Sequence, residues 1–407
     1  MGGVNAAKRG LTPQEYRLEV QALVPPLPVV RLPLAMCRGL VLAEDVTAGV
    51  SLPPFDNSAM DGYAVRASDV VSATAENPVR LPVADDIPAG RTDVAPLAPG
   101  TSQRIMTGAP LPEGADAIIQ VELTDGGTEN VRIDASVLPR THVRFVGEDV
   151  SSGDVILRAG TVLHPPQLGL AAAVGLAGLP VRRPPRVLVL STGSELVPPG
   201  DPLPPGHIYE SNSVLLAAAI EEIGGKAVVL RSVPDDVATF RAVVAEHVGE
   251  ADLLITSGGV SAGAYEVVKD ALSDQGVEFV QVAMQPGGPQ GRGSFEGLSV
   301  VALPGNPVSA ALSFELFLRP ALLSAMGHSR TDRPRARARA TAAMTSPPGR
   351  VQYRRGRHDA GHVEVVPVGG PGSHLLASFA ASNCLIEIPV GVAEVAAGDE
   401  VDLVLLD

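Results

Sequence analysis

The 407-residue sequence contains no tryptophan, and only 3% of its residues are aromatic. It has two cysteines, Cys37 and Cys384, which lie far apart and outside any CxxC pattern. So few cysteines argue against a disulfide framework or a zinc site and are typical of a protein of the reducing cytoplasm. Positive charge is also scarce. The net charge is −14, which disfavours a nucleic-acid partner, since such a partner needs a basic face.

Lysine is rare among the basic residues, because only Lys8, Lys226 and Lys269 occur. Lys269 stands just past a glycine loop, so we expect it to contact a bound anion. Long hydrophobic runs are missing as well. The longest apolar stretch, residues 168–181, is too short and too interrupted by glycine to cross a membrane. The first ten residues lack the apolar core of a signal peptide, so we expect no membrane partner and a cytoplasmic location.

The chain does contain an alternation of strand and helix patterns between residues 186 and 307. Three apolar, β-branched runs that each end at a glycine predict strands buried on both faces of a parallel sheet, namely Arg186–Gly193, Ala251–Gly259 and Ser299–Gly305. After the first run, Asn212 or Ser213 can cap a helix that stops at Gly224. This order predicts a doubly wound α/β domain.

Three glycine-containing loops follow these strands and should meet at the carboxyl edge of the sheet, where open parallel sheets bind ligands. Glycine lets the backbone approach a ligand closely, and a helix that starts there offers free N–H groups to an anion. Asn306 and Pro307 form such a helix start. The simpler alternative is that the glycines only make tight turns. The candidate anion-binding residues are Thr192, Gly193, Ser257, Gly258, Gly259, Ser261, Pro304, Gly305, Asn306 and Pro307.

The remaining patterns are mainly those of β structure. Thr12 is expected to cap an N-terminal helix, and residues 168–179 also look helical. Short apolar runs between turns predict an all-β module at residues 78–145 and a second small β domain at residues 341–407. Residues 52–66 mix apolar residues with Asp, Asn and Ser, so they form either a presented functional loop or an ordinary surface loop.

Six motifs resemble those of the molybdopterin molybdenumtransferase family, known as MoeA in bacteria and as the E domain of gephyrin in animals. They occur in the family's order and cover nearly the whole chain. The fifth motif is shared with the related molybdopterin adenylyltransferases, whereas the first motif and the β insertion distinguish this chain from them. The motifs are residues 54–66 (PFDNSAMDGYAVR), 105–112 (IMTGAPLP), 147–149 (GED), 191–196 (STGSEL), 257–261 (SGGVS) and 303–309 (LPGNPVS).

The resemblance implies four domains. These are an elongated discontinuous domain at residues 1–51 and 146–184, an inserted β domain at 52–145, the molybdopterin-binding α/β domain at 185–329 and a C-terminal β-barrel-like domain at 330–407. It also implies a homodimer whose active cleft lies between the α/β domain of one subunit and the inserted domain of the other. The implied reaction takes adenylylated molybdopterin and molybdate, with magnesium, and releases AMP and molybdenum cofactor.

The resemblance also gives roles to polar residues. Magnesium prefers oxygen ligands, commonly one or two carboxylates with phosphate and water. The dithiolene sulfurs of the substrate take the molybdenum, so the protein mainly positions the substrates and stabilises charge. Thr107 and Lys269 join the loop residues as substrate ligands, and Glu195, Asp235 and Glu266 are the candidate magnesium ligands. Any one of these carboxylates can instead cap a helix or lie on the surface. The candidate catalytic carboxylates are Asp61, Asp149, Glu195, Asp235, Asp236 and Glu266.

One departure from the family pattern keeps other functions open. Gln285 and Gly288 stand where many members carry lysines, so Lys269, Arg292 or Arg66 would have to supply the lost charge. A non-catalytic carrier or scaffold that binds molybdopterin is therefore an alternative. Two further alternatives are a molybdopterin adenylyltransferase and a sugar- or nucleotide-binding enzyme of another kind. The expected partners are small-molecule substrates, a second copy of the chain and other proteins of molybdenum cofactor biosynthesis.

Overall fold

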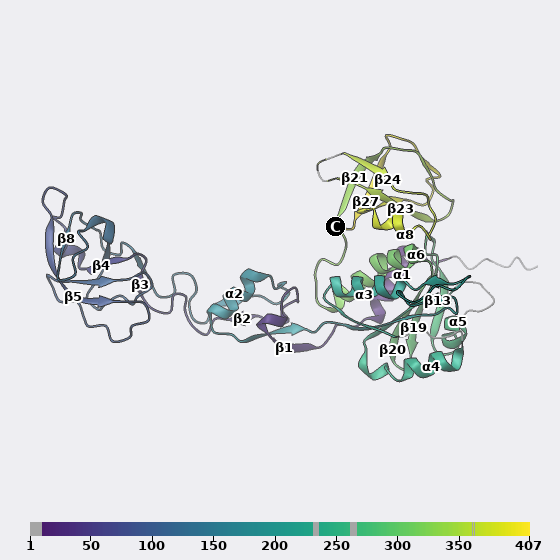
Figure 1. Cartoon of the computed structure of the whole chain (residues 1–407), viewed down its shortest axis with the longest axis horizontal. Helices are drawn as coiled ribbons and strands as arrows, with labels where there is room; N and C mark the ends of the chain where they lie inside the picture. Colours follow the sequence, from purple (N-terminus) through teal and green to yellow (C-terminus); the bar gives the residue numbers. More distant parts are fainter. Residues whose placement is uncertain (1–9, 231–235, 261–266, 360, 362) are drawn as a thin grey trace, which may run out of the picture. The chain divides into compact units, whose positions relative to one another are not determined.

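The computed structural model describes residues 10–230, 236–260, 267–359, 361 and 363–407 (Figure 1). This part of the chain forms two compact units. Unit 1 takes in the described residues up to Val30, Gly39–Ala43 and Pro180–Asp407, and unit 2 takes in Arg31–Arg38 and Glu44–Leu179. The chain first leaves unit 1 within β1 (Val29–Pro33) and finally returns to it within β11 (Gly178–Arg182). The four domain boundaries expected above are finer than this division and stay a prediction.

Unit 1 contains the predicted α/β domain. Its six-stranded sheet has the order β15-β12-β16-β20-β19-β17. The first four strands are parallel, and β19 is antiparallel to both of its neighbours. The three predicted strands are confirmed, because β12, β16 and β20 lie side by side. The strands are β12 (Arg186–Ser191), β15 (Lys226–Val229), β16 (Leu253–Ser257), β17 (Val277–Gln281), β19 (Pro289–Phe295) and β20 (Leu298–Leu303).

Alternate residues of the central strands face two different cores, as a doubly wound sheet requires. Val187 and Val189 of β12 lie in one core with side chains of α1, α3, α6 and α7, whereas Leu188 and Leu190 lie in the other with side chains of α4 and α5. The predicted doubly wound fold is therefore confirmed. The helices are α1 (Pro13–Leu23), α3 (Asn212–Glu222), α4 (Val237–Ala245), α5 (Val267–Leu272), α6 (Pro307–Ser313) and α7 (Arg319–Ala325), with a 3-10 turn η4 (Val248–Glu250).

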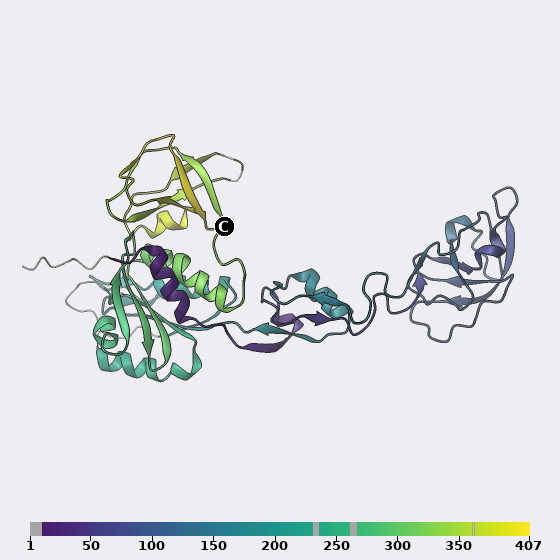
Figure 2. The same cartoon turned by 180° about the vertical axis from the view of Figure 1, so that it is seen from behind.

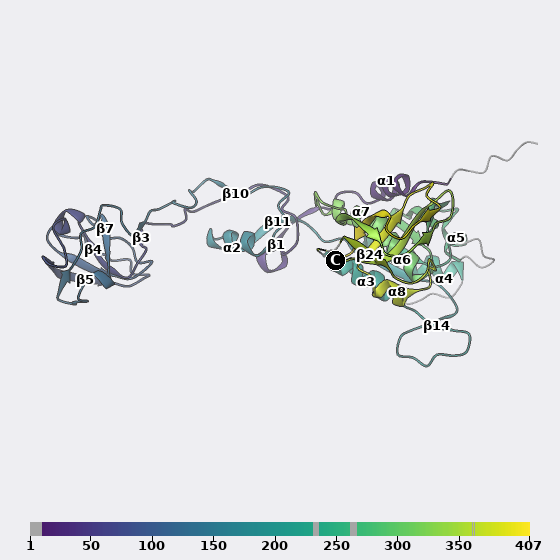
Figure 3. The same cartoon turned by 90° about the horizontal axis from the view of Figure 1, so that it is seen from above.

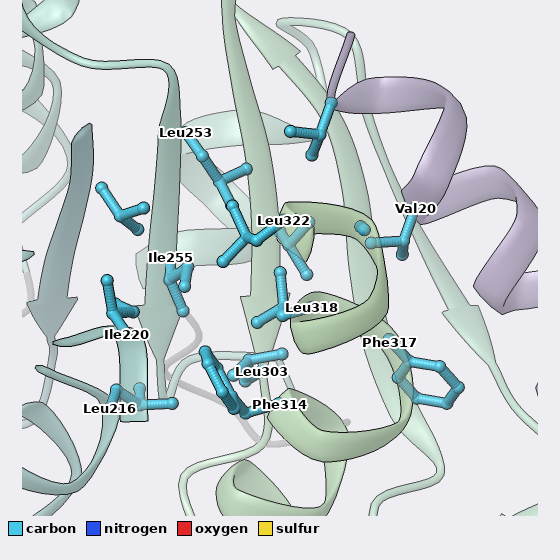
Figure 4. Packing of buried hydrophobic residues seen from close by; sticks show 14 of the residues in the cluster. Val20, Leu216, Ile220, Leu253, Ile255, Leu303, Phe314, Phe317, Leu318 and Leu322 are labelled. Carbon is cyan, nitrogen blue, oxygen red and sulfur yellow. The ribbon is translucent and has the colours of Figure 1, made fainter. Parts of the chain in front are cut away.

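Pro307–Ala325 is one continuous 19-residue helix in which a π-helical segment, η5 (Phe314–Leu318), joins α6 to α7. By length and hydropathy it is able to cross a membrane, and it exceeds residues 168–181, which the sequence led us to regard as the longest apolar stretch. However, 78% of its apolar window is buried inside the fold. Figure 4 shows Leu322 of this helix near Leu253 and Leu318 near Leu303, both strand residues, so this helix is a core element of unit 1.

Thr12 is the N-cap of helix α1, as predicted. The backbone N–H of Glu15 donates to Thr12 Oγ1 at 3.2 Å, and the N–H of Thr12 donates to Glu15 Oε2 at 2.7 Å, which completes a capping box. The helix packs against parts of the chain that are distant in sequence. Its Tyr16 hydroxyl donates to the carbonyl of Gly291 at 3.1 Å. Figure 2 shows α1, in purple, beside the green helix that contains α7.

The C-terminal part of unit 1 is a β-barrel, as predicted. Its strands follow the order β23-β24-β21-β27-β25, and β25 pairs back with β23, so five strands close on themselves. Closure removes the free edges that an open sheet would expose. The elements are β18 (Met284–Gln285), which pairs with β23, and β21 (Arg335–Ala340), β22 (Met344–Thr345), β23 (Val351–Arg357), β24 (Glu364–Pro367), α8 (Leu376–Ala380), β25 (Cys384–Ile388), β26 (Glu394–Val395) and β27 (Glu400–Leu405).

Unit 2 contains the predicted β module, a five-stranded sheet of order β7-β4-β6-β5-β8. Its apolar runs became strands as expected. Apart from the strands that join the units, its elements are η1 (Leu34–Met36), β2 (Val46–Thr47), β3 (Asn57–Ser58), β4 (Gly62–Val65), η2 (Ala67–Val70), β5 (Val79–Ile87), β6 (Ser102–Ile105), β7 (Ala117–Gln120), η3 (Val121–Leu123), β8 (Asn130–Ile133), β9 (Val143–Arg144), β10 (Val155–Leu157) and α2 (Pro165–Ala173).

Two expectations for unit 2 were wrong. Residues 52–66 are not simply a loop, because Asn57 and Ser58 are buried in β3 and every residue of β4 is buried. Gly62 is required there, since a Cβ would lie 1.9 Å from the carbonyl oxygen of Ile119. The helix expected at residues 168–179 instead starts at Pro165 and ends by Ala173, and strand β11 begins at Gly178.

Candidate active site

A cavity of about 930 Å³ opens at the carboxyl ends of β12, β16 and β20. The three predicted loops meet there, as the geometry of a parallel sheet requires. A second wall comes from the barrel, through Arg350 and the loop from Pro371 to His374. The sequence candidates that line the cavity are Thr192, Gly193, Glu195, Ser257, Gly258, Gly259, Pro304, Gly305, Asn306 and Pro307. Their binding roles stay a prediction.

The three loops pack closely against one another. A Cβ at Gly258, whose φ is +97°, would lie 2.7 Å from the carbonyl oxygen of Thr192. Gly305 is also close, since its own Cβ would be 3.3 Å from the Cα of Gly258. Glycine is therefore needed for packing here as well as for access, so the tight-turn alternative and the binding alternative both remain compatible with this position.

Asn212 joins the strand ends that form the cavity. The sequence suggested this residue or Ser213 as the cap of α3, but neither side chain caps the helix in that way. Instead, Asn212 Nδ2 donates to Ser257 Oγ at 2.7 Å and to the carbonyl oxygen of Gly305 at 2.7 Å. The side chain thus ties the first turn of α3 to the loops after β16 and β20.

Glu210 organises the same corner of the cavity. It is 9% exposed, and its carboxylate accepts hydrogen bonds from Ser191 Oγ at 2.8 Å and from the backbone N–H of Ser213 at 2.8 Å. The Ser213 hydroxyl is a third donor. Glu210 therefore satisfies the start of α3, the role expected of Asn212. Sequence reasoning missed Glu210. The signal present was a carboxylate three residues before a serine at a helix start.

The positive charge of the cavity comes from the barrel. Among the described lining residues, the basic side chains are those of Arg350 and His374. Arg350 is exposed and makes no hydrogen bond or ion pair with the described residues. Behind the loop, Arg355 donates to the carbonyl oxygens of Gly372, at 3.0 Å, and Gly370. Burial lowers the pKa of the Arg355 guanidinium, which has no carboxylate partner in the part of the chain that is described.

The expected replacements for the missing lysines lie elsewhere. Lys269 is on the exposed side of α5 and does not line the cavity. Arg292 forms ion pairs with Glu19 and, at 2.8 Å, with Glu278. Arg66 belongs to unit 2, where its guanidinium donates to the carbonyl of Leu97 at 3.3 Å.

The two departing positions themselves line the cavity. Gln285 Oε1 accepts a hydrogen bond from Gln352 Nε2 at 2.8 Å, which joins β18 to the barrel strand β23. Gly288 is buried, and its carbonyl accepts from the N–H of Val282 at 2.7 Å. At these two positions the cavity is thus lined by an amide and a glycine.

Asp61 and Thr107, two candidates from separate motifs, meet in unit 2. Asp61 Oδ1 accepts from the backbone N–H of Thr107 at 2.7 Å and from its hydroxyl at 2.8 Å. These bonds, the backbone one first, lower the pKa of Asp61, so its carboxylate stays ionised. Asp149 is exposed, and its backbone N–H donates to the carbonyl of Leu52 at 3.0 Å.

The remaining candidates give less support to a site. Asp235, Ser261 and Glu266 lie outside the described residues. Asp236 is the N-cap of α4, where it accepts from the N–H of Thr239 at 2.8 Å, and it does not line the cavity. The capping alternative is thus supported for Asp236. Within the described ranges, no group of three His, Cys, Asp or Glu side chains could hold a metal ion.

Family models match three parts of the chain. Residues 11–175 match the MoeA N-terminal region (domain I and II), residues 188–324 match the probable molybdopterin binding domain, and residues 337–406 match the MoeA C-terminal region (domain IV). The second match covers the domain that contributes β12, β16 and β20 to the cavity.

Curated relatives and solved structures match over almost the full length. Molybdopterin molybdenumtransferase 2 of Mycobacterium tuberculosis is 53% identical over 96% of this chain and 98% of its own. Molybdopterin molybdenumtransferase of Haemophilus influenzae is 38% identical over 89% of this chain and 90% of its own. The crystal structure of a Pyrococcus molybdopterin biosynthesis MoeA protein is 32% identical, with a TM-score of 0.83 over 98% of this chain and 99% of that one. Together with the ordered motifs and the observed fold, these matches show that the chain belongs to the MoeA family of molybdopterin molybdenumtransferases.

Proposed function

We propose that this protein works in molybdenum cofactor biosynthesis, inserting molybdate into adenylylated molybdopterin with release of AMP. The observation that carries the proposal is the coincidence of two findings. The residues that match a molybdopterin-binding domain include the strand-end loops that form the 930 Å³ cavity. The names of the curated relatives supply the reaction type.

The groups around the cavity fit this chemistry. The substrates are anionic, and the loops of Gly258 and Gly305 allow a substrate to approach the backbone closely. Arg350 adds a cation, and no carboxylate of the described ranges pairs with it. Because the dithiolene sulfurs of the substrate take the molybdenum, the protein only has to hold molybdate and the phosphoanhydride in position and stabilise their charge.

Magnesium fits this cavity through Glu195. Its carboxylate is exposed in the loop after β12, where it folds back toward Gly193. Magnesium commonly uses one or two protein carboxylates together with phosphate and water, so a single such group suffices. A bound ion would neutralise phosphate charge. Glu195→Gln should weaken magnesium binding measured by calorimetry in the presence of AMP. The assignment to Glu195 fails if the magnesium titration is unchanged.

Reconstitution tests the proposed reaction directly. Purified protein, adenylylated molybdopterin, molybdate and magnesium should give AMP and active molybdenum cofactor. Consumption of ATP with molybdopterin would instead identify an adenylyltransferase. Binding without turnover would support a carrier or scaffold. The observation that favours this alternative is that neutral Gln285, which pairs with Gln352, stands where many members carry a lysine.

We also propose that the protein acts as a homodimer in the cytoplasm, with other proteins of the same biosynthesis as partners. Support comes from the family resemblance for the dimer and from the scarcity of cysteine for the location. Sedimentation of the purified chain tests the dimer.

A further inference from the structure

A network of buried hydrogen bonds lies behind the lining of the cavity. Gln290 of β19 is fully buried, and its Nε2 donates to the carbonyl oxygen of Gly287 at 2.7 Å and to Ser313 Oγ at 2.6 Å. The Ser313 hydroxyl in turn donates to the carbonyl oxygen of Ser309 at 2.8 Å. Gly287 and Ser309 line the cavity, whereas Gln290 and Ser313 do not. The Gln290–Ser313 network therefore joins two cavity walls from behind.

These two walls come from different elements. Gly287 lies in the turn between β18 and β19, and Ser309 lies in the first turn of α6. Another wall is more open to solvent. It includes the exposed strand β14 (Ile208–Tyr209), and the loop that joins β14 to β13 (Leu196–Val197) extends away from the domain in Figure 3. The network thus supports the buried side of the cavity.

The direction of one peptide bond follows from this network. The carbonyl of Gly287 is directed at Gln290, and in a trans peptide the N–H of the next residue points the opposite way. The N–H of Gly288 is therefore directed away from Gln290 and toward the cavity, which both glycines line. Gly288 is buried, and its N–H donates to no acceptor among the described residues. Buried N–H groups are nearly always paired, so this one indicates an acceptor on a bound ligand.

The amide of Gln290 has a cost that this task explains. Its Oε1 is buried without a hydrogen-bond partner in the described ranges. An apolar side chain of the same length would leave no such acceptor unpaired, but it could not bind the carbonyl of Gly287. Directing the peptide between Gly287 and Gly288 is thus what the glutamine provides.

We infer that Gln290 is a positioning residue, which turns the N–H of Gly288 into the cavity as a donor to an oxygen of the bound oxyanion. The inference rests on the proposed function for the identity of that anion, which is molybdate or the phosphate of the nucleotide. Backbone N–H groups bind such anions without side-chain charge. The wall at residues 285–288 thus contributes a donor although it contains no lysine.

Glycine-selective NMR of the full chain tests this inference directly. When molybdate or AMP is added to the wild type, the amide proton of Gly288 should move downfield, because it gains an acceptor. The anion that causes the shift is the one that the N–H binds. Absence of a shift at saturation with both anions would overturn the inference, and this measurement needs no variant.

A substitution of Gln290 tests the positioning role. Gln290→Met keeps the length of the side chain and removes the donor, so the peptide before Gly288 is free to turn. Calorimetry should show that binding of the anion weakens about fivefold, since roughly one neutral hydrogen bond is lost, and the NMR shift of Gly288 should shrink.

Gln103→Met is the matched control. Gln103 of unit 2 is 1% exposed, its Nε2 donates to the carbonyl oxygen of Ala95 at 3.0 Å, and its Oε1 is likewise unpaired among the described residues. Wild-type affinity in Gln290→Met, or an equal loss in Gln103→Met, would also overturn the inference. Reconstitution separates this result from the proposed function. Turnover without a Gly288 shift would reject only the positioning role, whereas a Gly288 shift without turnover would reject only the reaction.

Discussion

Arg350 faces the cavity without a partner among the described residues, and we expect it to supply charge that the lysines provide in other members. Arg350→Ala should weaken molybdate binding about fivefold, since a contact from an exposed cation contributes roughly 1 kcal/mol. Lys269→Ala, which changes a cation outside the cavity, should leave the affinity unchanged. Calorimetry distinguishes these results. The opposite pattern, with Lys269 needed and Arg350 dispensable, would contradict the assignment.

A lysine at position 288 tests whether a new cation can replace the one that Arg350 supplies. A Cβ there would lie 2.1 Å from Nε2 at the flexible end of Gln281, so a lysine requires that side chain to move. The φ of the residue allows the change, because the positive φ of 95° belongs to Gly287 and not to Gly288, although the added Cβ would also lie 3.3 Å from the carbonyl oxygen of Val282. Gly288→Lys should therefore restore molybdate affinity to the Arg350→Ala protein. If calorimetry finds no recovery in a folded double variant, the two positions do not serve the same anion.

The carboxyl group of Asp61 should titrate below its ordinary value of 3.8, because Thr107 donates two hydrogen bonds to its ionised form. Thr107→Ala removes the hydroxyl and keeps the backbone donor, so the pKa should rise partway. A carbon-detected NMR titration of the Asp61 carboxyl measures both values. Equal pKa values in the two proteins would show that the hydroxyl bond is absent in solution.

At the scale of elements, an ion pair between Arg183 and Asp252 joins the starts of β12 and β16. The Arg183 guanidinium donates to both oxygens of Asp252, at 2.7 and 2.6 Å, and the same carboxylate accepts from the N–H of Arg186 at 2.8 Å. Burial alone would raise the pKa of Asp252, but these bonds outweigh it, and the pKa is lowered from 3.8. The folded state therefore favours the ionised carboxylate, and this stabilisation is present above the unfolded pKa and lost as pH falls through the folded one.

Arg183→Ala should lower the free energy of unfolding of unit 1 by about 2 kcal/mol near neutral pH, as expected for a partly buried charged pair. The difference from the wild type should shrink as pH falls below 3.8, where Asp252 becomes protonated in the unfolded chain. Denaturant unfolding at several pH values measures this. Arg337→Ala is the control, because Arg337 pairs only on the surface and should cost less than about 1 kcal/mol. A pH-independent difference would argue against the role of Asp252.

The sequence allowed the strands of the α/β sheet and their loops to be predicted because runs such as Arg186–Ser191 are apolar throughout and end at glycine. Strand β4 was missed, because Gly62–Val65 is short and lies among polar residues whose burial depends on pairing with β6 and β7. Arg350 and Glu210 were missed for a related reason. Their importance depends on which distant residues the fold places opposite them, and local composition carries no such signal.

At the scale of the whole molecule, we predict that active sites are shared between subunits. The family resemblance implies that Asp61 of one chain serves the cavity of another. Chains carrying Asp61→Ala and chains carrying Glu195→Ala should each be inactive. After subunit exchange, a mixed dimer would contain one intact site and one site that lacks both carboxylates. Each heterodimer should therefore have about half the activity of a wild-type dimer. Native mass spectrometry verifies the heterodimers. Absence of recovery in verified heterodimers would show that each site uses one chain only.

The capping box and core position of α1 have a consequence for the order of events during synthesis. This helix leaves the ribosome long before its partners, because Tyr16 bonds to Gly291 and the helix packs on α7, which ends at Ala325. At roughly 5–20 residues per second, about 15–60 s pass before those partners emerge. During this time the whole of unit 2 is made. During synthesis helix α1 therefore waits with its apolar face uncovered, and it is available in that interval to chaperones that bind nascent chains.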